Sequence, residues 1–180
     1  MSVFSNRSID PPEERAKYAG AILELVGGRE PMSILRETPD AAAKAIAGLT
    51  PIQLRTPEAL GKWSIAQVLQ HLADSDLVWG WRLRLILAQD RPPITGYDQD
   101  LWADRLHYAD ADAAQALETL RVLRRNNLWL IDRATPDDLE RAGVHSERGE
   151  ESIGYLRGLY AGHDLLHLRQ LERIRRSLSA

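Results

Sequence analysis

Four segments of this chain carry apolar residues every three or four positions, which is the spacing of one face of an α-helix. These segments cover about residues 31–49, 65–87, 113–134 and 152–178. A shorter segment follows Pro11-Pro12 and ends at Gly27-Gly28, and Pro39 either begins or kinks the first long helix. No segment of useful length alternates apolar and polar residues, as a half-buried strand would. We therefore expect an all-α chain with four main helices and a short leading helix.

The flanking residues mark where these helices begin and how they connect. Ser64, with Gln67 three residues later, forms a capping box before the segment at 65–87. Arg82 and Arg84 lie toward the end of that segment, where basic side chains complement the helix dipole. The connector at 88–111 is too long for a simple turn between antiparallel neighbours. It crosses the bundle, builds a site, or does both.

Composition limits the class of protein. The 180 residues are enough for one domain, 1–180, with a sizeable core. With 23 basic against 26 acidic residues, no bulk attraction to nucleic acid is expected. No apolar stretch approaches 18 residues and no signal-like N-terminus is seen, so we expect no membrane span and a cytoplasmic location. Cysteine is absent, so a metal ion would need nitrogen or oxygen ligands.

Two of the five histidines, His163 and His167, form the motif HDLLH. At this i, i+4 spacing their Cβ atoms lie about 6 Å apart on one helix face. Both occupy positions on the apolar stripe of the last helix. An unsatisfied buried polar group costs roughly 1–3 kcal/mol, and one metal ion would satisfy both rings. The alternative is a pair of core histidines hydrogen-bonded to their neighbours.

His71 lies at a core-facing position of the segment at 65–87, about 90 residues upstream of this pair. A set of three imidazoles leaves coordination positions open, as catalytic zinc sites do and structural ones usually do not. We therefore predict that His71, His163 and His167 bind one divalent metal ion. His107 and His145 fall in expected loops and are given no ligand role.

Four motifs follow one another along the chain: WSIAQVLQHLADSD (63–76), GYDQDLW (96–102), HSERG (145–149) and YAGHDLLHLRQLERI (160–174). Together they resemble the DinB/YfiT-like family of metalloenzymes, and the resemblance runs from about residue 18 to 178. It implies a four-helix bundle with up-down-down-up connectivity, which fits the long connector at 88–111. It also implies a metal bound by His71, His163 and His167, zinc or nickel as that metal, and a homodimer.

Four polar residues are candidates for supporting the metal or contacting a substrate, each with a plainer alternative. Asp74, one turn after His71, is a supporting acceptor, a fourth contact, or an exposed carboxylate. Asp98 either supports a histidine N–H or shapes a turn. Asn127 either faces a cavity or is a satisfied core amide. Arg148 either meets an anionic substrate or forms a surface ion pair.

Three functions are compatible with these residues. A metal-dependent hydrolase would use the ion to lower the pKa of a water toward 7. A low-molecular-weight-thiol S-transferase, implied by the resemblance, would activate an exogenous thiol. Both would act on small molecules, and five Tyr and five Trp against one Phe agree with an aromatic pocket. The third function is a non-catalytic metal-binding bundle. No general base stands out, so the catalytic residues are unknown.

Overall fold

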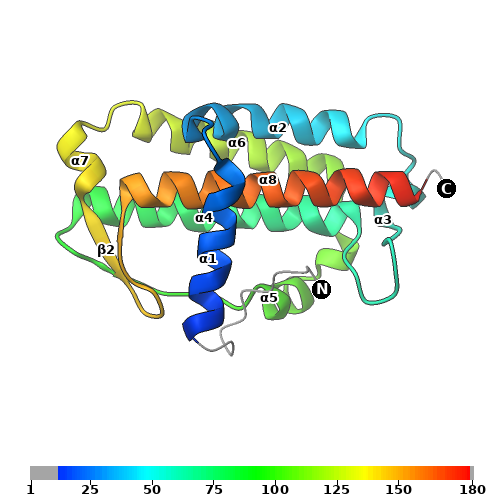
Figure 1. The fold of residues 1–180 in the computed structure, drawn as a ribbon. Coiled ribbons are helices and arrows are strands. Elements are labelled where there is room, and N and C mark those ends of the chain that lie inside the picture. The colour runs from blue at the N-terminus through cyan, green and yellow to red at the C-terminus, as the bar shows by residue number, and fades with distance from the viewer. Residues whose placement is uncertain (1–11, 179–180) are drawn as a thin grey trace.

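The structure is a computed structural model that describes residues 12–178. Its four long helices are α2 (Pro31–Ile46), α4 (Ile65–Ala88), α6 (Ala113–Ile131) and α8 (Ile153–Ser177). Figure 1 shows α2 and α8 running in one direction and α4 and α6 in the opposite direction. The expected four-helix bundle with up-down-down-up connectivity is therefore confirmed. The leading helix α1 (Pro12–Val26) crosses the bundle steeply and packs on α8 (Figure 1).

The helix ends follow the capping residues. Ser64 and Gln67 form the predicted capping box before α4. Helix α2 begins at Pro31, as the segment at 31–49 predicts, because Glu30 caps it and Pro31 takes its first turn. Pro39 therefore lies inside α2 and does not begin it.

The connectors contain short helices that sequence periodicity does not predict. They are α3 (Pro51–Arg55), α5 (Gln99–Arg105), the 3-10 turn η1 (Tyr108–Asp110) and α7 (Pro136–Glu140). Each is too short to show a repeated apolar stripe. The connector at 88–111 leads from the end of α4 back to the start of α6, so that these two helices run in the same direction (Figure 1).

A small three-stranded sheet is a further difference from the expected chain of helices and loops. Its strands are β1 (Pro93–Ile94), β2 (Ala142–His145) and β3 (Gly149–Ser152), in the order β1-β2-β3. The first pair is parallel and the second antiparallel. Strands of two to four residues are too short to show alternation. As a result, His145 lies on a strand and not in the loop that we expected.

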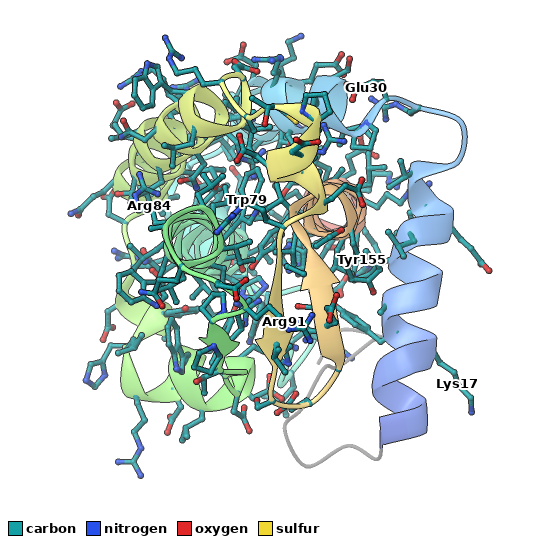
Figure 2. The ribbon with its side chains drawn as sticks, turned by 90° about the vertical axis from the view of Figure 1, so that its left-hand side faces the viewer. Lys17, Glu30, Trp79, Arg84, Arg91 and Tyr155 are labelled. Carbon is teal, nitrogen blue, oxygen red and sulfur yellow. The ribbon has the colours of Figure 1, made fainter. Side chains whose placement is uncertain are left out.

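The core of the bundle consists of two apolar clusters. One surrounds Trp79 and Leu156, and the other surrounds Leu72 and Leu171. Figure 2 shows Trp79 pointing from α4 into the bundle, whereas Lys17 on α1 points away from it. Buried polar residues such as Asp76 and Asp164 lie between the stretches of α4 and α8 that form the two clusters. Within residues 12–178, none of the helices has the length and apolar character that crossing a bilayer requires.

Candidate metal centre

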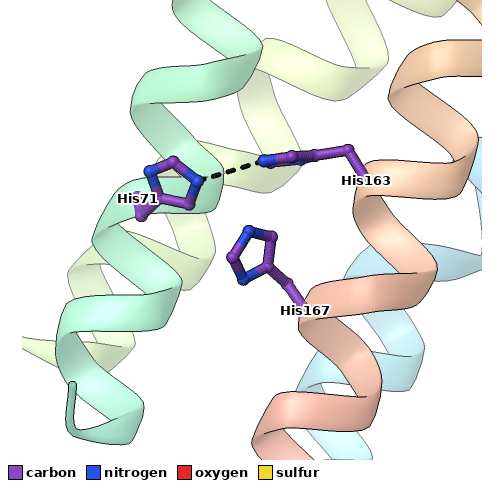
Figure 3. Close-up of side chains that lie close together, drawn as sticks. All are labelled: His71, His163 and His167. Atoms are coloured by element: carbon purple, nitrogen blue, oxygen red, sulfur yellow. Dashed lines mark hydrogen bonds between the residues drawn. The ribbon is translucent and has the colours of Figure 1, made fainter. Parts of the chain in front are cut away.

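The three predicted histidines come together between α4 and α8. His71 projects from α4 toward His163 and His167, which lie one turn apart on α8 (Figure 3). The Nε2 atoms of His71 and His163 are 3.1 Å apart. One ring nitrogen from each of the three residues lies within 4.8 Å of the others. Helices far apart in sequence thus bring three imidazole nitrogens to one point.

Burial keeps these imidazoles neutral. His71 and His167 are almost fully buried, and His163 is partly exposed. Desolvation lowers the pKa of His71 and of His163 well below the ordinary value, and the neighbouring histidines lower both further. Desolvation also lowers the pKa of His167 to about 4, although its hydrogen bond to Gln170 opposes the shift. At neutral pH each ring therefore offers a lone pair, the form that binds a metal ion.

Gln170 fixes the orientation of one ring. Its Oε1 lies 2.8 Å from Nδ1 of His167, so Nδ1–H donates and the Nε2 lone pair faces the other histidines. Two nitrogens bound to one ion at about 2.0–2.1 Å lie about 3 Å apart, close to the separation of the His71 and His163 Nε2 atoms. The donor set therefore fits a divalent ion that accepts nitrogen ligands, with coordination positions left open.

A cavity of about 70 Å³, partly open to solvent, adjoins the histidines. His71 and His163 form part of its wall, between α1, α4, α8 and the turn that joins β2 to β3. Tyr18, Tyr97 and Tyr160 supply aromatic walls. The connector at 88–111 thus both crosses the bundle and builds the site, because Tyr97 comes from it.

Arg148 also lines this cavity, but it is not the surface ion pair that was its alternative. Its Nε and Nη2 atoms lie 2.6 and 3.1 Å from the carboxylate of Glu151. The two side chains are only 14% and 2% exposed. Arg148 thus reaches the cavity with its charge already balanced.

The other three candidates do not line this cavity. Asp74 accepts hydrogen bonds from Gln70 and from the Tyr108 hydroxyl. Asp98 caps α5 by accepting from two backbone N–H groups, which is the turn-forming alternative. Asn127 donates to the backbone and side chain of Asp76 and is a satisfied core amide.

Sequence reasoning missed Arg82, which lines the cavity and is 5% exposed. Its position toward the end of the segment at 65–87 indicates only that its charge complements the helix dipole. Its spacing from His71 and Ser75, at i+11 and i+7, places all three on one face of α4. That spacing was the available signal, and the excess of tyrosine was a second.

Comparison with known proteins agrees with this geometry. A protein of Oceanobacillus iheyensis named "putative metal-dependent hydrolase" is 31% identical over 137 residues, which cover 76% of this chain and 79% of its own. A Bacillus mycoides protein with the same description is 30% identical over 162 residues, covering 90% and 92%. YfiT from Bacillus subtilis is described as a probable metal-dependent hydrolase with an unusual four-helix bundle topology. It superposes with a TM-score of 0.75 and 25% identity, covering 98% of this chain and 94% of its own. The family model of the DinB superfamily matches residues 34–171, and this chain therefore belongs to the DinB superfamily.

Proposed function

We propose that this protein is a metal-dependent hydrolase of small molecules, with one divalent ion bound by His71, His163 and His167. The observation that carries the proposal is the convergence of three ring nitrogens within 4.8 Å at the wall of a cavity. The names of the relatives support the same class of activity. Zinc and nickel both accept imidazole ligands, and we propose one of them as the native metal.

The roles of the side chains follow from their contacts. A divalent ion with open positions supplies Lewis acidity and lowers the pKa of a water toward 7. The neutral imidazoles offer lone pairs, and Gln170 holds His167 in the tautomer that directs Nε2 inward. Because His71 and His163 line the cavity, the open positions would face a substrate there.

The cavity also supplies neutral hydrogen-bonding groups. The Tyr97 hydroxyl lies 3.2 Å from Ser75 Oγ. Desolvation, with a smaller effect of Tyr160, raises the pKa of Tyr97 to about 12. Tyr97 therefore stays protonated at neutral pH and can donate a hydrogen bond to a bound substrate.

The proposal is tested by assaying a panel of esters and amides with protein loaded with zinc or nickel and with chelator-treated protein. We expect turnover in the loaded wild type and loss of turnover in His163→Ala. His107→Asn is the matched control, since His107 is exposed and its positive φ of 57° suits asparagine. Hydrolysis that persists after the metal is removed would contradict the proposal.

The same assay separates the two alternative functions. Turnover of electrophiles only when glutathione, bacillithiol or mycothiol is present would indicate a thiol S-transferase. A stoichiometric ion without turnover of either substrate class would indicate a non-catalytic metal-binding bundle.

We also propose that the protein is a cytoplasmic homodimer. Helices α4 and α6 leave large apolar side chains open to solvent in the single chain, among them Leu77, Trp81 and Trp129, at 53%, 62% and 55% exposure. Light scattering during size exclusion tests the assembly, because a mass near the 20.3 kDa of one chain would contradict it.

A further inference from the structure

We propose that the substrate of this site carries a carboxylate group and that Arg82 is the residue that binds it. The inference rests on the proposed function, because it names the substrate class of the same cavity. Arg82 lines the cavity together with His71, His163 and Tyr160.

Arg82 is a buried cation that contacts no carboxylate among the residues that the structure describes. Its Nη1 donates to the Tyr160 hydroxyl over 3.2 Å, and its Nη2 donates to the backbone oxygen of Thr95 over 3.0 Å. Nη2 also lies 3.4 Å from Nε2 of His145. The partners are a phenol, a peptide oxygen and an imidazole. None of them carries the negative charge that a guanidinium in a poorly hydrated position needs.

Arg124 is as deeply buried as Arg82 but differs from it in this respect, and so does the half-buried Arg148. Arg124 is paired with Asp76 and Asp164, and Arg148 is paired with Glu151. In the part of the chain that the structure describes, no carboxylate lies within ion-pair distance of Arg82, and its Nε has no hydrogen-bond partner. Arg82 is thus a cavity-lining arginine whose charge remains for a ligand to balance.

Two acidic residues near the cavity do not neutralise the charge of Arg82. The carboxylate of Glu151 is occupied by Arg148. Glu147 lines the cavity, but its carboxylate lies against Gly96 and forms no ion pair with Arg82 in the described residues. An incoming carboxylate is the chemistry that matches the guanidinium best, because charge-assisted hydrogen bonds to arginine are strong and directional.

The position of Arg82 suits a substrate that also reaches the histidines. Side chains on a helix lean toward its N-terminus, so the Arg82 head leans along α4 toward Ser75 and His71. The Tyr160 ring, whose hydroxyl contacts Arg82, has its centroid 6.4 Å from the His163 ring centroid. One small molecule can therefore place its carboxylate at Arg82 and its scissile bond at the three histidines.

The remaining walls of the cavity indicate which part of the substrate joins its carboxylate to its scissile bond. Tyr18, Ile22 and Leu159 contribute aromatic and aliphatic surface to the cavity. Apolar walls favour a ligand with an apolar body. We therefore infer an apolar or aromatic carboxylate as the substrate class.

Arg82 also has a structural role, because its contact with Thr95 ties the segment after β1 to α4. If that were its whole role, the cavity would not distinguish an anion from a neutral ligand of the same shape. Phenylacetate and phenylacetamide are such a pair, and they separate the two roles without any enzymatic assay.

Isothermal titration calorimetry with the full chain, metal-loaded and chelator-treated, provides the test. In the chelator-treated wild type we expect phenylacetate to bind about tenfold or more tightly than phenylacetamide, and added salt to weaken only phenylacetate. Arg82→Gln should weaken phenylacetate by about tenfold to a hundredfold and change the amide less than about twofold. Arg82→Lys should restore part of the preference. Arg84→Gln is the matched control, since Arg84 contacts Gly80 and Asn127 away from the cavity.

Equal affinity for the two compounds in the wild type, or no binding of either, would overturn the proposal, and so would an equal loss for both in Arg82→Gln. If circular dichroism shows that Arg82→Gln does not fold, the wild-type comparison decides alone. The failure of the proposed function is distinguishable. Protein that prefers phenylacetate but binds no metal would contradict the proposed function and support this inference. Protein that binds metal but lacks the preference would contradict this inference.

Discussion

Two polar clusters lie next to each other in the bundle, and only one of them is complete. We call them the arginine cluster (Arg124, Asp76, Asp164, Asn127) and the histidine cluster (His71, His163, His167). Both include residues of α4 and α8, and the arginine cluster also takes Arg124 and Asn127 from α6. His163 and Asp164 are adjacent in sequence. The difference separates buried polar residues that serve the fold from residues that, in our proposal, bind a ligand.

The arginine cluster pairs one buried cation with two buried carboxylates. Arg124, on α6, lies 2.7 Å from oxygens of both Asp76 on α4 and Asp164 on α8. It also donates to the backbone oxygen of Leu35 on α2 over 2.6 Å. One side chain thus connects the four long helices, and each of the three charged side chains has a partner of opposite sign.

The histidine cluster has no such compensation. Its rings face one another, and the Nδ1 atoms of His71 and His163 have no hydrogen-bond partner among the described residues. Burial keeps the rings neutral, so no charge inside the cluster holds it together. We infer that the arginine cluster is structural, and we propose that a ligand completes the histidine cluster.

The largest expected effect is the loss of the arginine cluster. Arg124→Leu leaves Asp76 and Asp164 buried without a cation, which should lower the free energy of unfolding by about 3–5 kcal/mol. Urea denaturation of the chelator-treated protein measures this change. A loss below about 1 kcal/mol would mean that the cluster does not hold the four helices.

The next effect concerns pH. His167 has a pKa of about 4 in the folded protein against about 6.5 in an unfolded chain, so the unfolded state binds a proton first as pH falls. The stability of the metal-free protein should be complete above about pH 6.5 and fall toward pH 4, by about 3 kcal/mol from His167 alone. Unfolding curves at several pH values should show a shallower dependence in His167→Gln. Equal dependence in both proteins would contradict the assignment.

A smaller effect is expected from the residue that orients His167. Gln170→Leu removes the acceptor from Nδ1 and should weaken metal binding by about tenfold to a hundredfold. Competition with a chromophoric chelator measures the affinity. Gln115→Leu, at an exposed position of α6, is the control and should bind metal as the wild type does. Unchanged affinity in Gln170→Leu would exclude this orienting role.

The smallest effect comes from an arginine outside both clusters. Arg36 pairs with Asp132, and these side chains are 49% and 40% exposed. Because solvent screens this pair, Arg36→Leu should cost less than about 1 kcal/mol of unfolding free energy. Urea denaturation beside Arg124→Leu provides the comparison, and a similar loss in both variants would remove the distinction between buried and exposed pairs.

The sequence predicts the bundle and the histidine cluster because both depend on helical spacing. The i, i+4 spacing of His163 and His167 places them on one face of a helix, and the apolar stripe shows that this face is buried. The Ser64 capping box marks where α4 begins. The connector at 88–111 reflects the parallel direction of α4 and α6.

The rest depends on contacts between segments far apart in sequence. Strand β1 has two residues and exists because it pairs with β2, about 50 positions later. Asp74 could not be assigned from its spacing to His71, because Tyr108 on η1 engages it. Arg82 turns toward the cavity because Tyr160 and Thr95 accept its hydrogen bonds there. Helical periodicity contains no information on such partners.

The most direct measurement of the central claim is elemental analysis of freshly purified wild type beside His71→Ala, with His107→Asn as the control. We predict about one divalent ion per chain in the wild type and the control, and loss of that ion in His71→Ala, because two imidazoles from one helix no longer enclose it. Equal metal content in all three proteins would contradict the histidine site.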